Sequence, residues 1–220
     1  MSFHARLQAA TAKARAGLLA TPILQRLPRG DIRLADYTAF LLQAYHHVKH
    51  TVPLLMAVGA RLDDGKAWLR TAVIEYITEE AGHEEWVLDD LEACGVERAA
   101  ACASQPNAAT ELMVAYAYDT VQRVNPLGFF GMVQVLEGTS VALASQAAAT
   151  IQQTLGLPDA AFSYLRSHGA LDQEHVTLFA GLMDRITAPA EQALIVHAAN
   201  MFYRLYGAVL RSLDEPSPCS

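Results

Sequence analysis

Apolar residues recur every three or four positions along nearly the whole chain, which is the period of an α-helix with one buried face. The run over residues 35–62 is typical. Phe40, Leu41 and Ala44 fall on one face, and Pro53 should kink the helix or interrupt it. No segment alternates between apolar and polar residues in the manner of a strand. The pattern therefore predicts a protein built of helices alone.

The helical pattern is interrupted at glycine, proline and aspartate, and these interruptions set the expected number of helices. Gly95 suits the position just after a helix, and the pair Asn125 and Pro126 should stop another. The pattern predicts about seven helices, at residues 3–25, 35–62, 65–95, 107–124, 126–155, 159–186 and 189–213. With no repeat and no long linker, we expect a single-domain all-α bundle over residues 1–213 and a flexible C-terminal tail at 214–220.

Composition narrows the class of protein. The chain has 220 residues, of which 52% are hydrophobic, and its 16 basic and 23 acidic residues give a net charge of −7, which argues against a nucleic-acid partner. No uninterrupted apolar run of membrane-spanning length stands out, and the first residues lack the apolar core of a signal peptide. Cys94, Cys102 and Cys219 have no zinc-binding spacing. We expect a cytoplasmic protein with no membrane partner.

Three polar residues in the segment "HGALDQEHVTLF" would share one stripe of a helix. His168, Asp172 and His175 are spaced at i, i+4 and i+7, so two imidazoles and one carboxylate would point the same way. Such a stripe is either part of a metal site or a solvated face. A metal site would need further ligands from other helices.

Glu137 is an isolated carboxylate in an apolar helix. No Lys or Arg occurs between Arg123 and Arg166, and the only acidic residues in that interval are Glu137 and Asp159. A buried carboxylate must be paired, protonated or bound to a cation, because burial of an uncompensated charge is very costly. The alternatives are that Glu137 lies on an exposed strip or meets an Arg from another helix.

A third group of polar residues lies in "EYITEEAGHEEW", where Glu80 and Glu79 precede His83 by three and four positions. Glu-x-x-His is typical of helices that bind a carboxylate-bridged di-iron centre, although glutamate-rich helix faces are usually solvated. Counted together, the three helices offer three imidazoles and three carboxylates. This is a donor set suited to Fe and Mn, with no thiolate to favour structural zinc.

At these residues the chain resembles the haem-oxygenase-like di-iron oxidases, within the superfamily that includes TenA, PqqC and haem oxygenase. The matching motifs are "EEAGHEEW", then "VLEG" 54 residues after His83, then "HGALDQEH", and the resemblance spans most of residues 30–185. It implies a seven-helix haem-oxygenase-like bundle and a centre of two Fe(II) ions, with Mn as an alternative metal. It further implies activation of O2 for decarboxylation, N-oxygenation or C–C cleavage of an amino- or fatty-acid-like substrate.

The resemblance also implies which residues bind the metal. Some members place a glutamate seven residues before the first histidine, where this chain has Tyr76, and others place it three before, where this chain has Glu80. We choose Glu80 and keep Glu75 and Glu79 in reserve. The expected ligands are thus Glu80, His83, Glu137, His168, Asp172 and His175.

Two further residues are candidates for catalysis. Tyr76 lies seven residues before His83, and a tyrosine near oxidising iron could carry a radical or be oxidised itself. Lys49, in the motif "YHHVKH", could meet a substrate carboxylate, although hydrogen-bonded or surface side chains explain that motif as well.

The expected partners are a small-molecule substrate and an external electron donor, and the apolar surplus is compatible with a homodimer. The alternative is a metal-free TenA- or PqqC-like enzyme, or a ligand-binding protein, on the same fold. TenA thiaminases rely on a nucleophilic cysteine, and neither Cys94 nor Cys102 is placed like one. Haem oxygenases have a proximal histidine in the first helix, whereas His4 lies very near the terminus.

Overall fold

A computed structural model describes residues 1–214, with the exception of the side chains of residues 168–175. The described residues form helices joined by short connections, with no strand among them. The α-helices are α1 (Phe3–Leu19), α2 (Pro22–Arg26), α3 (Leu34–Val48), α4 (Thr51–Arg61), α5 (Ala67–Glu80), α6 (His83–Ala93), α7 (Arg98–Ala103), α8 (Ala108–Asp119), α9 (Phe129–Leu155), α10 (Ser163–Asp184) and α11 (Pro189–Ser212). The predicted all-α fold is confirmed.

The number of helices is larger than predicted, because three of the expected long helices are each broken once. Pro22 begins α2 and Pro53 lies in the first turn of α4, where a missing N–H costs nothing. The third break is at Gly82, whose φ of 93° lies in the left-handed region that favours glycine. In addition, α7 forms where a loop was expected around Cys102. Eleven α-helices therefore replace the predicted seven in the described part of the chain.

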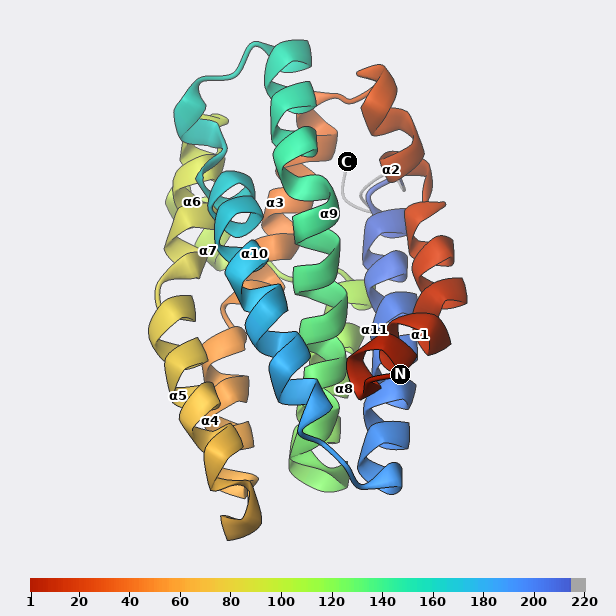
Figure 1. Cartoon of the computed structure of the whole chain (residues 1–220). Coiled ribbons are helices and arrows are strands. Elements are labelled where there is room, and N and C mark those ends of the chain that lie inside the picture. Colours follow the sequence, from red (N-terminus) through yellow and green to blue (C-terminus); the bar gives the residue numbers. More distant parts are fainter. Residues whose placement is uncertain (215–220) are drawn as a thin grey trace.

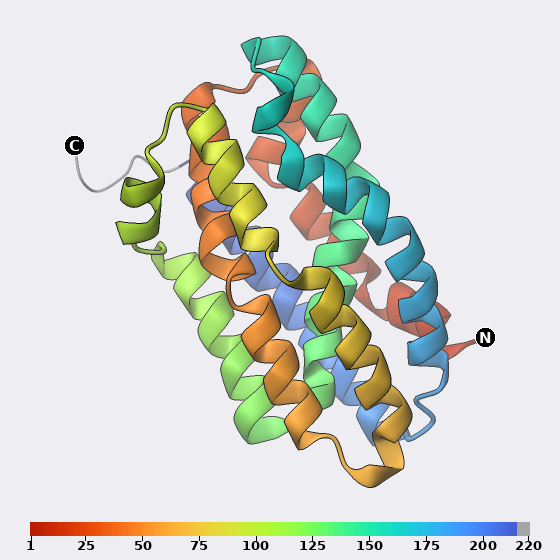
Figure 2. The ribbon, with the colours of Figure 1, turned by 90° about the vertical axis from the view of Figure 1, so that its left-hand side faces the viewer.

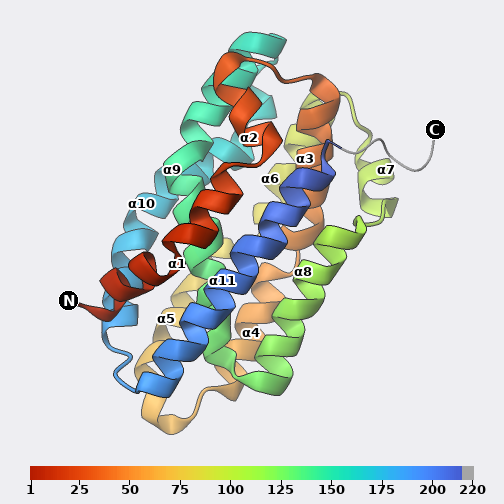
Figure 3. The same cartoon turned by 90° about the vertical axis from the view of Figure 1, so that its right-hand side faces the viewer.

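The bundle is arranged around α9 (Figure 1). This helix packs against α10 on one side and against α11 on another, while α1 lies across α11 (Figure 3). The consecutive helices α4 and α5 form an antiparallel pair, and α6 packs against α3 and α10 (Figure 2). Because α9 has neighbours on several sides, its side chains reach the centre of the molecule from one end to the other.

Two segments, Pro126–Leu155 and Pro189–Ser212, are long and apolar enough to cross a membrane when judged by length and composition alone. In the bundle, 61% of the apolar window of the first and 44% of that of the second are buried against other helices. Core helices of soluble proteins pass the same test. Packing inside the bundle therefore accounts for the apolar character of Pro126–Leu155 and Pro189–Ser212.

A close contact between two helices lies at Gly131, where α9 meets α11. A Cβ atom at this position would lie 2.5 Å from the backbone nitrogen of Ala199 and 2.8 Å from the Cβ of Ala198. Gly131 is therefore required by close approach of two backbones, since no side-chain movement could relieve the contact with Ala199.

We expect Gly131→Ala to lower the free energy of unfolding by about 1–3 kcal/mol, because an extra methyl group overpacks the contact between α9 and α11. The matched control is Gly138→Ala on the same helix, where the nearest atom to the added Cβ is 3.7 Å away. The control should raise stability by up to about 1 kcal/mol through helix propensity. Equal effects of the two variants in urea titrations would contradict the assigned contact.

Candidate metal centre

Glu80 and Glu137, two of the carboxylates singled out by the sequence, line the same cavity. The cavity has a volume of about 70 Å³ and lies between α5 and α9, with walls from α3, α4, α10 and α11. Its lining contains no Lys or Arg among the described residues. The lining residues are His47, Val48, Thr51, Leu55, Tyr76, Glu80, Phe129, Met132, Val133, Leu136, Glu137, Ser140, Tyr164 and Tyr206.

The break between α5 and α6 places Glu80 beside His83. Glu80 is the last residue of α5 and His83 the first of α6, so the prediction that both lie on one continuous helix is wrong. The turn at Gly82 nevertheless keeps them together, because Nδ1 of His83 lies 3.1 Å from Oε2 of Glu80. The imidazole is buried and stacks on the indole of Trp86, with the ring centroids 4.0 Å apart.

Of the three glutamates considered as the sixth ligand, only Glu80 lines the cavity, and its role as a ligand stays a prediction. Its side chain is 11% exposed and faces the cavity, whereas Glu75 and Glu79 are exposed residues of α5 that do not line the cavity.

Glu137 lies in the middle of α9, and the structure does not place it on an exposed strip, because it is partly buried and lines the cavity. On another side it contributes to a smaller space of about 20 Å³ with His4 and Gln8 of α1. Carboxylates from α5 and α9, with an imidazole from α6 next to one of them, form a donor set that fits Fe or Mn.

The stripe of His168, Asp172 and His175 lies outside the described side chains, so its placement relative to the cavity stays a prediction. These residues belong to α10, which packs against α9 and α6. Among the described side chains, no three His, Cys, Asp or Glu residues gather closely enough to hold a metal ion. Any complete site would therefore need ligands from residues 168–175.

The two catalytic candidates lie in different places. Tyr76 is buried and lines the cavity with Glu80 and Glu137. Lys49, at the end of α3, does not line it: its Nζ lies 3.3 Å from Nδ1 of His46 and 4.8 Å from the ring centroid of Tyr45. The roles of both residues stay predictions.

Several lining residues were not singled out as site residues from the sequence. His47 is buried and meets the ring of Tyr206 at a centroid distance of 6.1 Å, and Tyr164 enters from the start of α10. Phe129 and Met132 also line the cavity. For His47, the only available signal was the unusual density of histidines in "YHHVKH".

Asp90 of α6 fixes the beginning of α10, the helix that carries residues 168–175. Its side chain is fully buried, Oδ1 accepts a hydrogen bond from the backbone N–H of Ser163 at 2.7 Å, and Oδ2 accepts one from Tyr164 at 3.0 Å. These N–H groups belong to the first turn of α10, where no intrahelical acceptor is available. Burial raises the pKa of Asp90 to about 6, while the two hydrogen bonds act in the opposite direction.

Comparisons with known proteins agree with this architecture. The model of a family described as iron-containing redox enzymes matches residues 38–207. A domain with a haem-oxygenase-like fold from Shewanella denitrificans superposes with a TM-score of 0.84 at 23% identity, over 94% of this chain and 89% of that one. A TenA homologue from Pseudomonas syringae gives a TM-score of 0.76 at 12% identity, over 94% and 90% of the two chains.

Haem oxygenase from Leptospira interrogans gives a TM-score of 0.74 at 14% identity, over 96% of this chain and 100% of that chain. None of the curated proteins matches the sequence. At these identities the likenesses show that the fold is haem-oxygenase-like and carry no information on chemistry.

The pKa of Asp90 predicts how stability depends on pH. Because the pKa is raised by folding, the folded state holds more protons than the unfolded state between about pH 4 and pH 6, and the free energy of unfolding falls as pH rises through that window. Relative to Asp90→Asn, which cannot ionise, the stability of the wild type should therefore fall by about 2–3 kcal/mol between pH 4 and pH 7. Urea titrations of both proteins at each pH measure this difference. A difference that is flat or rises with pH would show that the two N–H groups, rather than burial, determine the pKa.

Proposed function

The chain belongs to the family of iron-containing redox enzymes, and from this we propose that it is a non-haem di-iron oxidase or oxygenase. The proposed substrate is a small amino- or fatty-acid-like molecule, which would undergo decarboxylation, N-oxygenation or C–C cleavage with O2 as co-substrate. An external electron donor would complete a catalytic cycle. The proposal goes beyond the family membership in naming two Fe(II) ions rather than haem or a single iron.

One observation carries the proposal: Glu80 and Glu137, from two helices far apart in the sequence, line one cavity whose described lining has no Lys or Arg. Enclosed carboxylates are stable when a cation compensates them, and a divalent metal is the cation that fits this set of oxygen and nitrogen donors. His83 supports the assignment because its Nδ1 lies 3.1 Å from the carboxylate of Glu80.

The described residues would have distinct tasks. Glu80, His83 and Glu137 would bind the metals, together with the donors expected on α10. The bound ferrous ions would supply the electrons with which O2 is activated. Phe129 and Met132 are almost fully buried and would limit the access of water from the α9 side.

Tyr76 would be placed to exchange a proton or an electron with the centre, because its ring is buried and lines the same cavity as both glutamates. This assignment gives Tyr76 a role in turnover. It does not require Tyr76 to bind metal.

A metal-free TenA-like enzyme has less support. Cys94 is buried, burial raises its pKa to about 11, and neither Cys94 nor Cys102 lines the cavity. A thiol with a raised pKa is a poor nucleophile near neutral pH, because little of it is thiolate.

Anaerobic titration with Fe(II) tests the proposal. We expect two ions per chain, and a stabilisation of about 2.7 kcal/mol when free Fe(II) is 100 times its dissociation constant. Glu137→Gln and Glu80→Gln should each raise the dissociation constant of at least one Fe(II) ion. The increase should exceed roughly 10–100-fold, which is the effect of losing a residue that only hydrogen-bonds to a metal ligand. Glu75→Gln is the matched control, because Glu75 lies on the same helix as Glu80 and is exposed.

Two results would contradict the proposal. One is the absence of Fe(II) binding in a folded protein, together with turnover that persists in chelator. The other is equal Fe(II) binding by Glu137→Gln, Glu75→Gln and the wild type. Either result would favour a metal-free enzyme or a ligand-binding protein on this fold.

A further inference from the structure

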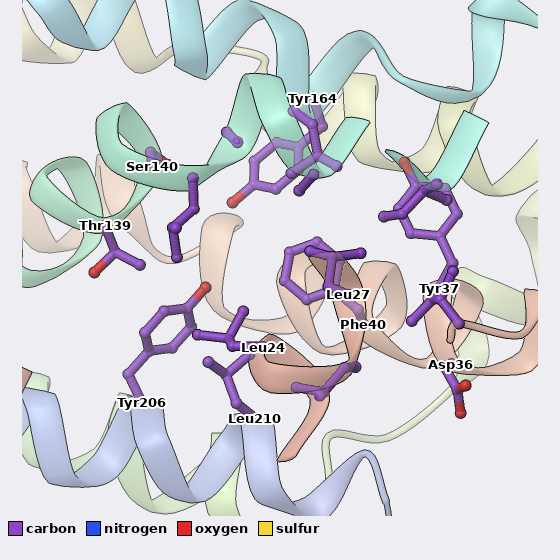
Figure 4. A pocket seen from close by; sticks show the side chains of 17 residues that line it. Leu24, Leu27, Asp36, Tyr37, Phe40, Thr139, Ser140, Tyr164, Tyr206 and Leu210 are labelled. Atoms are coloured by element: carbon purple, nitrogen blue, oxygen red, sulfur yellow. The ribbon is translucent and has the colours of Figure 1, made fainter. Parts of the chain in front are cut away.

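The cavity that Glu80 and Glu137 line, which we call the metal-side cavity, adjoins a second cavity of about 90 Å³ (Figure 4). Ser140, Tyr164 and Tyr206 line both of them. The two tyrosines come from different helices, α10 and α11, and their rings stand on opposite sides of the second cavity (Figure 4).

The walls of the second cavity are mostly aliphatic or aromatic. Its only charged residue among those described is Asp36, whose carboxylate points away from it (Figure 4). One stripe of α9 with helical spacing faces the two cavities, and its members are Glu137, Ser140, Ala144, Ala147 and Ile151. A charged reductant would find no partner in the second cavity, so electrons for the metal centre need another route.

On the side of α5 and α6, a chain of contacts leads from the metal-side cavity to the surface. Glu80 lines the cavity, Nδ1 of His83 lies 3.1 Å from its Oε2, and the imidazole stacks on the indole of Trp86. Neither His83 nor Trp86 is among the described residues that line the cavity. Since His83 is 2% exposed and Trp86 is half-buried, the order of contacts runs from the cavity to solvent.

The two rings at the outer end of this chain are in direct contact. The centroids of His83 and Trp86 are 4.0 Å apart, and the ring planes are inclined by 25°. The residues are spaced at i and i+3 at the start of α6, so the helix keeps both rings on one face. Because electron tunnelling slows steeply with each gap between groups, stacked rings are a favourable connection.

Trp86 differs from Tyr76 in what can reach it. Indole and phenol are the side chains that most readily give up a single electron. Tyr76 lines the metal-side cavity but is 2% exposed, so a donor outside the protein cannot touch its ring. Trp86 contacts the imidazole on one side and is half-exposed to solvent on another.

The charge around Trp86 favours loss of an electron from its ring. Residues 79–90 include six acidic side chains and no Lys or Arg. Arg98 forms ion pairs with Glu85 and Asp89, which leaves this segment negative. Negative surroundings stabilise the positive charge that develops on an oxidised indole, and they attract a cationic reductant.

The other tryptophan of the chain, Trp68, is in the opposite situation. It is also half-buried, but the guanidinium carbon of Arg185 lies 3.9 Å from its ring centroid, and that positive charge opposes loss of an electron. Trp68 and Glu80 are 12 residues apart on α5, which corresponds to about 18 Å along the helix. Trp68 is therefore a matched control for Trp86.

From these contacts we infer that Trp86 is the residue through which single electrons pass from an external one-electron donor to the metal centre. Trp86 gives one electron to the centre that O2 has oxidised and takes one electron back from the donor. A proton that leaves the indole N–H for water in the first step returns in the second, so Trp86 is unchanged overall. The inference rests on the proposed function for the metals and adds the side of the protein at which the donor acts.

Fluorescence tests the contact without turnover. In Trp68→Phe the only emitting indole is Trp86, and anaerobic Fe(II) should remove most of its fluorescence, because an ion with a partly filled d shell accepts the excitation through the stacked imidazole. In Trp86→Phe, which retains only Trp68, Fe(II) should leave most of the fluorescence. Zn(II) has a filled d shell and should quench neither variant. Equal quenching of the two variants by Fe(II) would overturn the inference.

Reduction kinetics test the route itself. The Fe(II)-loaded protein is oxidised with O2 and then mixed anaerobically with hexaammineruthenium(II), a cationic one-electron reductant, and the absorbance of the centre is followed by stopped flow. Trp86→Phe should be reduced about tenfold more slowly, which is a rise of about 1.4 kcal/mol in the barrier of that step. Trp86→Tyr, whose phenol can give up an electron, should recover part of the rate, and Trp68→Phe should match the wild type.

The outcomes separate electron transfer from a positioning role. Phenylalanine keeps an aromatic ring against the imidazole, so Fe(II) affinity should be unchanged in Trp86→Phe. Weaker Fe(II) binding with slow reduction that Trp86→Tyr does not recover would show that Trp86 only orients His83, and would overturn the inference. Fe(II) binding with equal reduction rates in Trp86→Phe and the wild type would overturn it while the proposed function stands. Absence of Fe(II) binding would overturn both.

A measurement on the wild type covers the case in which Trp86→Phe does not fold. When Fe(II)-loaded protein is exposed to O2 with catalase present and no reductant, an indole that has lost an electron is not reduced again and is trapped by O2. Mass spectrometry of proteolytic peptides should then find oxidised Trp86 in excess over oxidised Trp68. Equal oxidation of these two half-buried tryptophans would overturn the inference.

Discussion

The contact between α9 and α11 at Gly131 leaves no room for a methyl group, and the positions of both cavities depend on it. Glu137 follows Gly131 by six residues on α9, and Tyr206 follows Ala199 by seven residues on α11, so both cavity-lining residues lie within about two helical turns of the contact. Because packed interiors respond to changes as small as one methylene group, a shift at this point would move the walls of both cavities. The glycine thus acts on the candidate site through the backbone, without touching it.

Electrostatics divides α9 into two parts. The helix has no Lys or Arg, and Glu137 is its single acidic residue, so the charge within it is confined to one position on the cavity-facing stripe. Beyond Ser140 the stripe is aliphatic. The low dielectric of such surroundings strengthens any interaction of the carboxylate with a cation and penalises an unpaired charge. The helix α9 therefore contributes Glu137, next to which a cation would be favoured, and a stripe beyond Ser140, next to which apolar groups would be favoured.

The sequence predicted the fold class and pointed to Glu80, Glu137 and Tyr76, which line one cavity, and it failed where tertiary packing decides. Helical periodicity was enough for the all-α bundle, and the absence of Lys and Arg around Glu137 was enough to single it out, although the sequence left open whether it is buried or exposed. The break at Gly82 was missed because a glycine inside a helical pattern is compatible with either a continuous helix or a stop. His47 and Tyr206 were missed for a different reason. Their periodicity shows which face they occupy, but only the position of the opposing helices shows that a cavity lies there.

The break at Gly82 also explains how α5 and α6 contribute separately to one region. On a continuous helix, Glu80 and His83 would be fixed relative to each other by a single helical turn. With the turn in between, Glu80 is oriented by α5, which packs against α4, and His83 by α6, which packs against α3 and α10. Asp90 lies about two turns after His83 on α6, and its carboxylate binds the first turn of α10. These bonds fix the start of α10 against α6. The pair α6 and α10, rather than the motif around His83 alone, would bring imidazoles from two helices to the carboxylates of α5 and α9.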